Sequence, residues 1–148
     1  MKRIIAIVAG GDSSEHDVSM RSAEGIYSFI DKDKYTLYIV ELTRHKWEAL
    51  LPDGSRAVID KNDFSFNHDG QKVVPDFAYI TIHGTPGENG ILQGYFELIG
   101  IPYSTCDVLV SAMTFSKFTL NQYLKGFGVR VACVLLNLIS GFTVRQKE

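Results

Sequence analysis

The chain has 148 residues, of which 45% are hydrophobic and 11% aromatic, enough for one globular domain with a packed core. The formal net charge is −2 at pH 7 and no dense Lys/Arg cluster occurs, which argues against a nucleic-acid surface. The apolar run at 131–139 is far shorter than the roughly 20 residues that a membrane span needs. We therefore expect neither nucleic acid nor a membrane as a partner.

The cysteines and the N-terminus indicate in which cellular compartment the protein is expected. Cys106 and Cys133 show neither metal-ligand spacing nor a disulfide framework, which is typical of a reducing compartment, and we expect both to be small core residues. The basic start and the apolar run after it are superficially like a signal peptide, but the run is short and is interrupted by Gly-Gly-Asp. We expect a cytoplasmic protein.

The first predicted elements are a strand and a helix joined by a glycine turn. The isoleucine-rich run 4–9 is typical of a strand buried on both faces of a parallel sheet, and Gly10-Gly11 then lets the chain turn sharply. Ser14 and Asp17 have the spacing of a capping box, which predicts a helix over 14–30 with Glu15 in its first turn. The positions expected on its inward side are Val18, Ser22, Ala23, Ile26, Phe29 and Ile30.

The next region predicts a second strand and an insertion. Residues 35–41 are rich in β-branched and aromatic side chains, so a strand there completes a βαβ unit. Between residues 44 and 75, short alternating segments surround Asp53-Gly54 and Asp69-Gly70, two strong hairpin signals. We predict an inserted pair of β-hairpins that elaborates the scaffold.

The strand–loop–helix pattern then repeats. A buried strand at 77–82 runs into the glycine-rich loop 83–90, and apolar residues at helical spacing follow until Gly100. After a short extended segment, two further helices are predicted over 107–114 and 116–127. The expected fold is an α/β, Rossmann-like open sheet, mostly parallel, with helices on both faces.

The two loops that follow buried strands each carry an acid, a histidine and glycines: Glu15 with His16, and His83 with Glu88. Because carboxyl ends of parallel strands meet at one sheet edge, these loops should outline one crevice. Helix N-termini there attract a carboxylate and Glu15 suits an ammonium group, so the natural ligand is a zwitterionic amino acid. Taken singly, Glu15 could only favour its own helix, His83 could be structural, and Lys117 could be a solvated surface lysine.

Three motifs in order and spacing resemble the D-alanine:D-alanine ligases. They are Gly10-Gly11-x-Ser13-x-Glu15-His16-x-Val18-Ser19 with Ser22-Ala23, His83-Gly84-x-x-Gly87-Glu88-Asn89-Gly90 with Gln93-Gly94, and Glu97-x-x-Gly100-Ile101-Pro102-Tyr103. The resemblance covers roughly residues 3–130. It implies the family's N-terminal substrate-binding domain, the pre-ATP-grasp domain, over 1–130.

The resemblance also implies an activity and roles for residues. In that family ATP activates one D-alanine as an acyl phosphate, and the amine of a second displaces phosphate to form the peptidoglycan dipeptide. Glu15 matches the acid that anchors the first ammonium group, Val18 a substrate-lining position, and His83 the histidine beside the first carboxylate. Glu88 matches a position that holds the second loop, and Lys117 the lysine that reaches the nucleotide phosphates. ATP with Mg²⁺ or Mn²⁺ would serve the full-length enzyme, and a homodimer is plausible.

The sequence departs from the family pattern in the second loop and beside the lysine expected to contact the nucleotide. Asn89 stands where the family usually has aspartate, and Ser116 precedes Lys117 where an Asp-Lys pair is common. Thr105-Cys106 also replaces a common Gly-Ser. Contacts to the nucleotide are therefore less secure expectations than contacts to the substrate.

Residues 131–148 carry no ligase motif, and we expect an atypical tail that is an edge strand, a swapped element or disordered. The ATP-grasp domains and their metal ligands are absent from this sequence, so we expect a truncated or frame-shifted chain that binds no metal and is inactive alone. The alternative is a noncatalytic binding module that self-associates through the apolar tail. A flavin or dinucleotide binder is disfavoured because the third glycine of G-x-G-x-x-G is missing.

Overall fold

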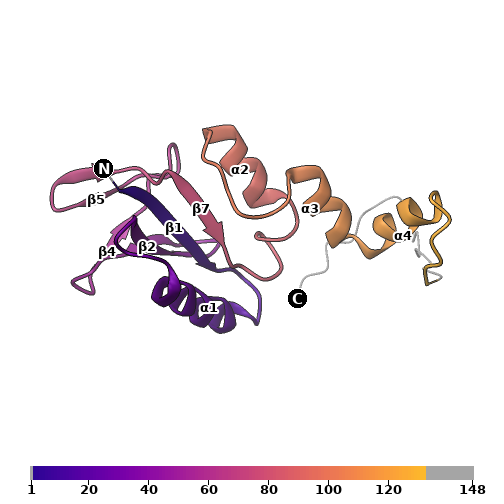
Figure 1. Ribbon diagram of the computed structural model, residues 1–148, viewed down its shortest axis with the longest axis horizontal. Helices are drawn as coiled ribbons and strands as arrows, with labels where there is room; N and C mark the ends of the chain where they lie inside the picture. The colour runs from indigo at the N-terminus through magenta and orange to yellow at the C-terminus, as the bar shows by residue number, and fades with distance from the viewer. Residues whose placement is uncertain (1, 133–148) are drawn as a thin grey trace.

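The computed structural model describes residues 2–132 and has a five-stranded sheet at its centre (Figure 1). The order across the sheet is β4-β3-β2-β1-β7. The strands are β1 (Arg3–Gly10), β2 (Tyr35–Leu42), β3 (Trp47–Leu50), β4 (Arg56–Val58) and β7 (Phe77–Ile80). β1 pairs in parallel with both β2 and β7, whereas β3 and β4 add antiparallel strands at one edge.

Helices cover both faces of this sheet, as the sequence predicts. Side chains alternate along β1, so Ile7 and Ala9 pack with α1 (His16–Phe29) on one face, while Val8 belongs to the cluster on the other face. That second cluster is built around α2 (Ile91–Ile99), whose Phe96 is fully buried. Figure 1 shows the two helices on opposite sides of the strands. Burial on both faces explains why the first strand is an unbroken apolar run.

Both predicted hairpins form, at the two Asp-Gly turns. β3 and β4 are paired across the turn that contains Gly54, and they extend the main sheet instead of standing apart from it. β5 (Phe66–His68) and β6 (Gln71–Val73) form a separate two-stranded sheet across Asp69-Gly70, where both residues have positive φ.

The expected start of α1 is wrong, and its expected inward side is right for Ala23, Ile26 and Ile30 but wrong for Val18 and Phe29. The helix begins at His16, with Glu15 as N-cap and no side-chain capping bond, so the Ser14–Asp17 capping box does not form. Val18 is 51% exposed and Phe29 90% exposed, whereas the buried positions are Ser19 and Ala23. The inward face is therefore rotated towards Ser19, a polar residue that an apolar-spacing argument passes over.

The last described elements are α3 (Val108–Phe115) and α4 (Lys117–Lys125), which lead away from the sheet in Figure 1. Cys106, just before α3, is exposed, so the expectation that it is a core residue is wrong. Cys133 and the predicted tail from residue 133 lie outside the described residues. Among those described, no helix is long and apolar enough to cross a membrane.

Candidate functional site

The first loop leaves β1 at two glycines that lie close to their neighbours. Gly10 and Gly11 have φ of +100° and +93°, a region that L side chains rarely adopt. A Cβ on Gly10 would lie 2.8 Å from the Leu42 carbonyl oxygen, and one on Gly11 would lie 2.7 Å from the Ile82 side chain. The loop is therefore pressed between the ends of β2 and of the segment after β7.

Glu15 and Val18 lie on the exposed start of α1. Among residues 2–132, the Glu15 carboxylate makes no hydrogen bond or ion pair, and its backbone carbonyl accepts a bond of 2.9 Å from the Ser19 amide. Val18 presents its side chain to solvent on the same turn. An acid held on a rigid helix end with no described partner can receive an ammonium group from a ligand.

The second loop, residues 83–90, is braced by side chains. The Gly84 amide donates to Glu88 Oε2 at 2.7 Å, and the Glu88 amide donates back to the Gly84 carbonyl at 2.8 Å. Gln93, fully buried on α2, donates from Nε2 to the Gly87 carbonyl at 2.6 Å and to Thr105 Oγ1 at 2.9 Å. Glu88 therefore shapes the loop through its carboxylate.

Hydroxyl groups join the two loops. Ser13 Oγ donates to the His83 carbonyl at 3.3 Å and accepts from the Glu15 amide at 3.2 Å. One turn later, the fully buried Ser19 Oγ donates to the Thr81 carbonyl at 2.9 Å and accepts from the Gly10 amide at 3.0 Å. The Glu15 and His83 loops are thus hydrogen-bonded to each other through Ser13.

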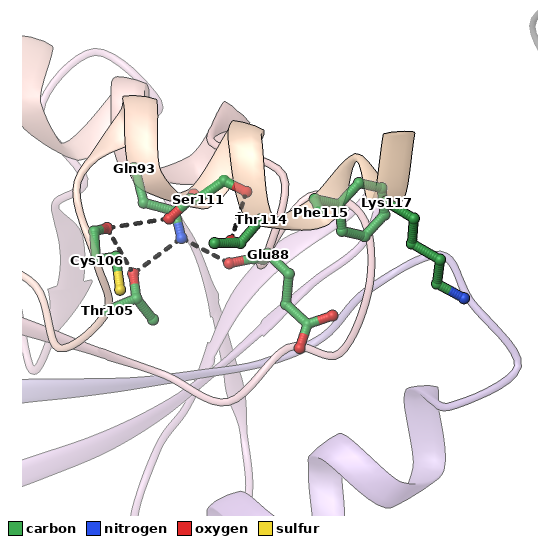
Figure 2. Close-up of a pocket in the computed structure, with 9 residues that line it drawn as sticks. Glu88, Gln93, Thr105, Cys106, Ser111, Thr114, Phe115 and Lys117 are labelled. Carbon is green, nitrogen blue, oxygen red and sulfur yellow. Dashed lines mark hydrogen bonds between the residues drawn. The ribbon is translucent and has the colours of Figure 1, made fainter. Parts of the chain in front are cut away.

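Two adjoining cavities follow the second loop. A smaller one of about 330 Å³ lies between α1 and β7, with His83, Glu88 and Ser22 in its wall. A larger one of about 620 Å³ lies under α3 and the start of α4, with Glu88 and Lys117 in its wall. Figure 2 shows both charged side chains directed away from the Gln93–Thr105 hydrogen bond. The cavities share Gly87, Glu88 and Thr105.

The structure thus places the five predicted site residues in separate positions. His83 and Lys117 line different cavities, Glu88 lines both, and Glu15 and Val18 lie outside both walls. Ser13 and Ser19 were missed by sequence reasoning. The only sequence signal for these two serines is their place in the first motif. Ser19 lies at a helix position that the structure shows to be buried.

His16, paired with Glu15 in the sequence argument, faces elsewhere. Its Nε2 lies 3.3 Å from Glu41 Oε1 on β2, and its Nδ1 lies 3.2 Å from Asp17 Oδ1. Burial raises the pKa of Glu41, but the hydrogen bond and charge of Arg56, together with Lys46 and His16, outweigh burial and hold that pKa below its usual value. This charge cluster braces the edge of the sheet beside the first loop.

The described residues do not provide a magnesium site. Within residues 2–132 there is no group of three or more His, Cys, Asp or Glu side chains arranged to hold a metal. Of the described residues, Glu88 is the only carboxylate in the larger cavity wall, and one of its oxygens already accepts from Gly84. Mg²⁺ needs several oxygen ligands in near-octahedral geometry, so this donor set does not fit it. Lys117 is the one cationic side chain that the described part of the chain contributes to that wall, which suits a single phosphate contact and not a whole triphosphate.

Comparison with known proteins identifies the family of the chain. A family model described as D-ala D-ala ligase N-terminus matches residues 4–106. The D-alanine–D-alanine ligase of Phocaeicola vulgatus is 70% identical over all 148 residues, which cover 45% of that protein. The chain therefore spans less than half the length of this relative.

Solved structures show the same fold. D-alanyl-alanine synthetase A from Vibrio cholerae superposes with a TM-score of 0.75 at 32% identity, over 86% of this chain and 38% of the other. The D-alanine–D-alanine ligase of Bacillus anthracis complexed with ATP gives a TM-score of 0.66 at 26% identity, over 97% of this chain and 43% of the other. The chain belongs to the D-alanine–D-alanine ligase family and corresponds to its N-terminal region.

Proposed function

We propose that this chain forms the part of an ATP-dependent D-alanine–D-alanine ligase that binds the first D-alanine. The observation that carries the proposal is the pair of loops joined through Ser13, which links the backbone of Glu15 to that of His83. The Glu15 carboxylate has no hydrogen-bond or ion-pair partner among residues 2–132. The match to the N-terminal region of the family supports the choice of substrate.

Each residue then has a physical task in binding a zwitterion. Glu15 accepts the ammonium group in a charge-assisted hydrogen bond, and the exposed methyl groups of Val18 offer an apolar contact for the alanine methyl. His83 donates to the carboxylate from the wall of the smaller cavity. Glu88 keeps the second loop in shape through Gly84. In this scheme Glu15 orients the substrate and transfers no proton.

ATP enters the proposal as a second substrate. When bound, it supplies the phosphoryl group that activates the D-alanine carboxylate, and Lys117 at the start of α4 would contact one phosphate. The contribution of this chain is positioning, which can supply a large share of a rate enhancement when two anionic reactants must meet. A cytoplasmic location, where ATP is available, belongs to the same proposal.

A chimera tests the proposal. The chain replaces the matching region of the Phocaeicola vulgatus ligase, and phosphate release from ATP is measured against D-alanine concentration. We expect an active enzyme in which Glu15→Gln lowers kcat/KM for D-alanine by about 10- to 100-fold, because the carboxylate charge that pairs with the ammonium group is lost.

Glu24 provides the matched control, since it is an exposed glutamate on the same helix. Glu24→Gln should leave kcat/KM within about twofold, as expected for a surface change remote from any site. A folded chimera without activity, or equal activities for the Glu15 and Glu24 variants, would overturn the proposal.

A further inference from the structure

The peptide group between His83 and Gly84 is held at both of its polar ends. Its carbonyl oxygen accepts from Ser13 Oγ at 3.3 Å, and its N–H donates to Glu88 Oε2 at 2.7 Å. The Gly84 φ of +72° lies in the left-handed region, so the chain turns directly after this peptide. A peptide plane held at both ends holds the His83 Cα, the atom that carries the imidazole side chain, in place.

The same Ser13 hydroxyl also contacts the other loop. It accepts from the Glu15 amide at 3.2 Å, just where the chain enters α1. A serine hydroxyl has one hydrogen to donate and two lone pairs, so it can serve both loops at once. Glu88 braces the second loop from within, whereas Ser13 ties that loop to the start of α1.

We propose that Ser13 is a positioning residue that sets the His83 imidazole relative to the Glu15 carboxylate. This inference rests on the proposed function, because it takes these two groups as the holders of one D-alanine. Ser13 itself contacts no substrate in this scheme. It acts through the His83–Gly84 peptide on one side and through the first turn of α1 on the other.

Kinetics of the chimera provide the first test. Ser13→Ala removes the hydroxyl and should raise KM for D-alanine about 5- to 30-fold, while KM for ATP stays within about twofold. Ser13→Thr keeps a hydroxyl and should restore KM for D-alanine to within about threefold. Ser28→Ala, which removes an exposed hydroxyl near the far end of α1, is the control.

A double-mutant cycle separates positioning from general destabilisation. If Ser13 acts through His83, Ser13→Ala should cost less than about twofold in KM for D-alanine once His83→Ala is present. A merely structural serine would cost the same factor in both backgrounds. An unchanged KM in Ser13→Ala, or full additivity with His83→Ala, would overturn the inference.

A measurement on the 148-residue chain keeps the test independent of ligation. In NMR spectra, Ser13→Ala should shift the Gly84 amide and the His83 ring resonances, which lie about 70 residues away along the chain, whereas Ser28→Ala should shift neither. An inactive chimera with unmutated Ser13 counts against the proposed function alone. Unshifted His83 and Gly84 resonances in Ser13→Ala count against the positioning role alone.

Discussion

At the scale of single residues, serine hydroxyls hold the edge of the sheet where the loops meet. Ser19 is fully buried on α1 and connects the end of β1, through the Gly10 amide, with Thr81 just after β7. Thr81 Oγ1 in turn donates to the Val8 carbonyl at 3.1 Å. These bonds give partners to the Gly10 amide and to the Thr81 and Val8 carbonyls at the ends of the parallel strands.

Removing the Ser19 hydroxyl should therefore be costly. Ser19→Ala leaves the buried Gly10 amide without this acceptor, and we expect the free energy of unfolding to fall by about 1 to 3 kcal/mol. Urea unfolding followed by circular dichroism measures the change. Ser28→Ala removes an exposed hydroxyl on the same helix and should stay within about 0.5 kcal/mol of the parent chain. Equal stabilities of the two variants would contradict this role for Ser19.

At the scale of elements, the antiparallel edge of the sheet depends on charge pairing. Glu41 on β2 stands directly opposite Glu48 on β3, an arrangement that is unfavourable by itself. Arg56 on β4 hydrogen-bonds both carboxylates, and Lys46 lies 3.1 Å from Glu48 Oε2. The two cations convert a repulsive pair into a bridge between three strands.

This bridge predicts a dependence of stability on pH. The folded pKa of Glu41 lies below its ordinary value of 4.5, so its contribution is complete above that value and is lost as pH falls through the folded pKa. Arg56→Met should lower the free energy of unfolding by about 1 kcal/mol at pH 7, because the pairs are partly exposed. The difference from the parent chain should shrink below pH 4.5.

Urea titrations at pH 7, 5, 4 and 3 check this. Lys125→Met is the control, since Lys125 makes no ion pair with any residue that the structure describes. A constant Arg56→Met difference across the whole pH range would show that the arginine acts through its packing and not through its charge.

Most helices, strands and turns could be predicted from residues that are neighbours in the sequence. The two Asp-Gly turns and the glycine stop at Gly100 are signals carried by a few neighbouring residues, and all three appear at the predicted places. The start of α1 was predicted wrongly: the turn before the helix is held by Ser13, which bonds the Glu15 amide and the His83 carbonyl, and no side chain caps the helix. A contact with a residue 70 positions away is invisible to a pattern of four adjacent residues.

At the scale of the whole molecule, the described residues supply only some of the groups that the proposed reaction needs. Glu15, His83 and Glu88 gather at one sheet edge, but residues 2–132 contain no carboxylate cluster for Mg²⁺, and Lys117 is the one cation in the larger cavity wall. A triphosphate and a carboxylate repel each other strongly unless cations lie between them. We therefore expect the 148-residue chain by itself not to ligate D-alanine.

An assay of the purified chain with ATP, Mg²⁺ and D-alanine tests this expectation. Phosphate release should stay at the background seen without D-alanine, while the Phocaeicola vulgatus ligase serves as the positive control. Release that depends on D-alanine and disappears in Glu15→Gln would show that the chain forms a complete active site, contrary to the donor set of the described residues.

The sequence by itself determined the order of strands and helices, the two hairpins and the family, because each depends on periodicity, turn chemistry or motif spacing. The roles of the five candidate site residues stay predictions that rest on the resemblance to the family. Only the tertiary structure decided which side of α1 is buried, that His16 faces Glu41, and that Ser13 and Ser19 join the loops. The physical reason is that hydrogen bonds between distant backbone segments depend on how the sheet brings strand ends together. The spacing of residues along the chain does not indicate which strand ends lie next to each other.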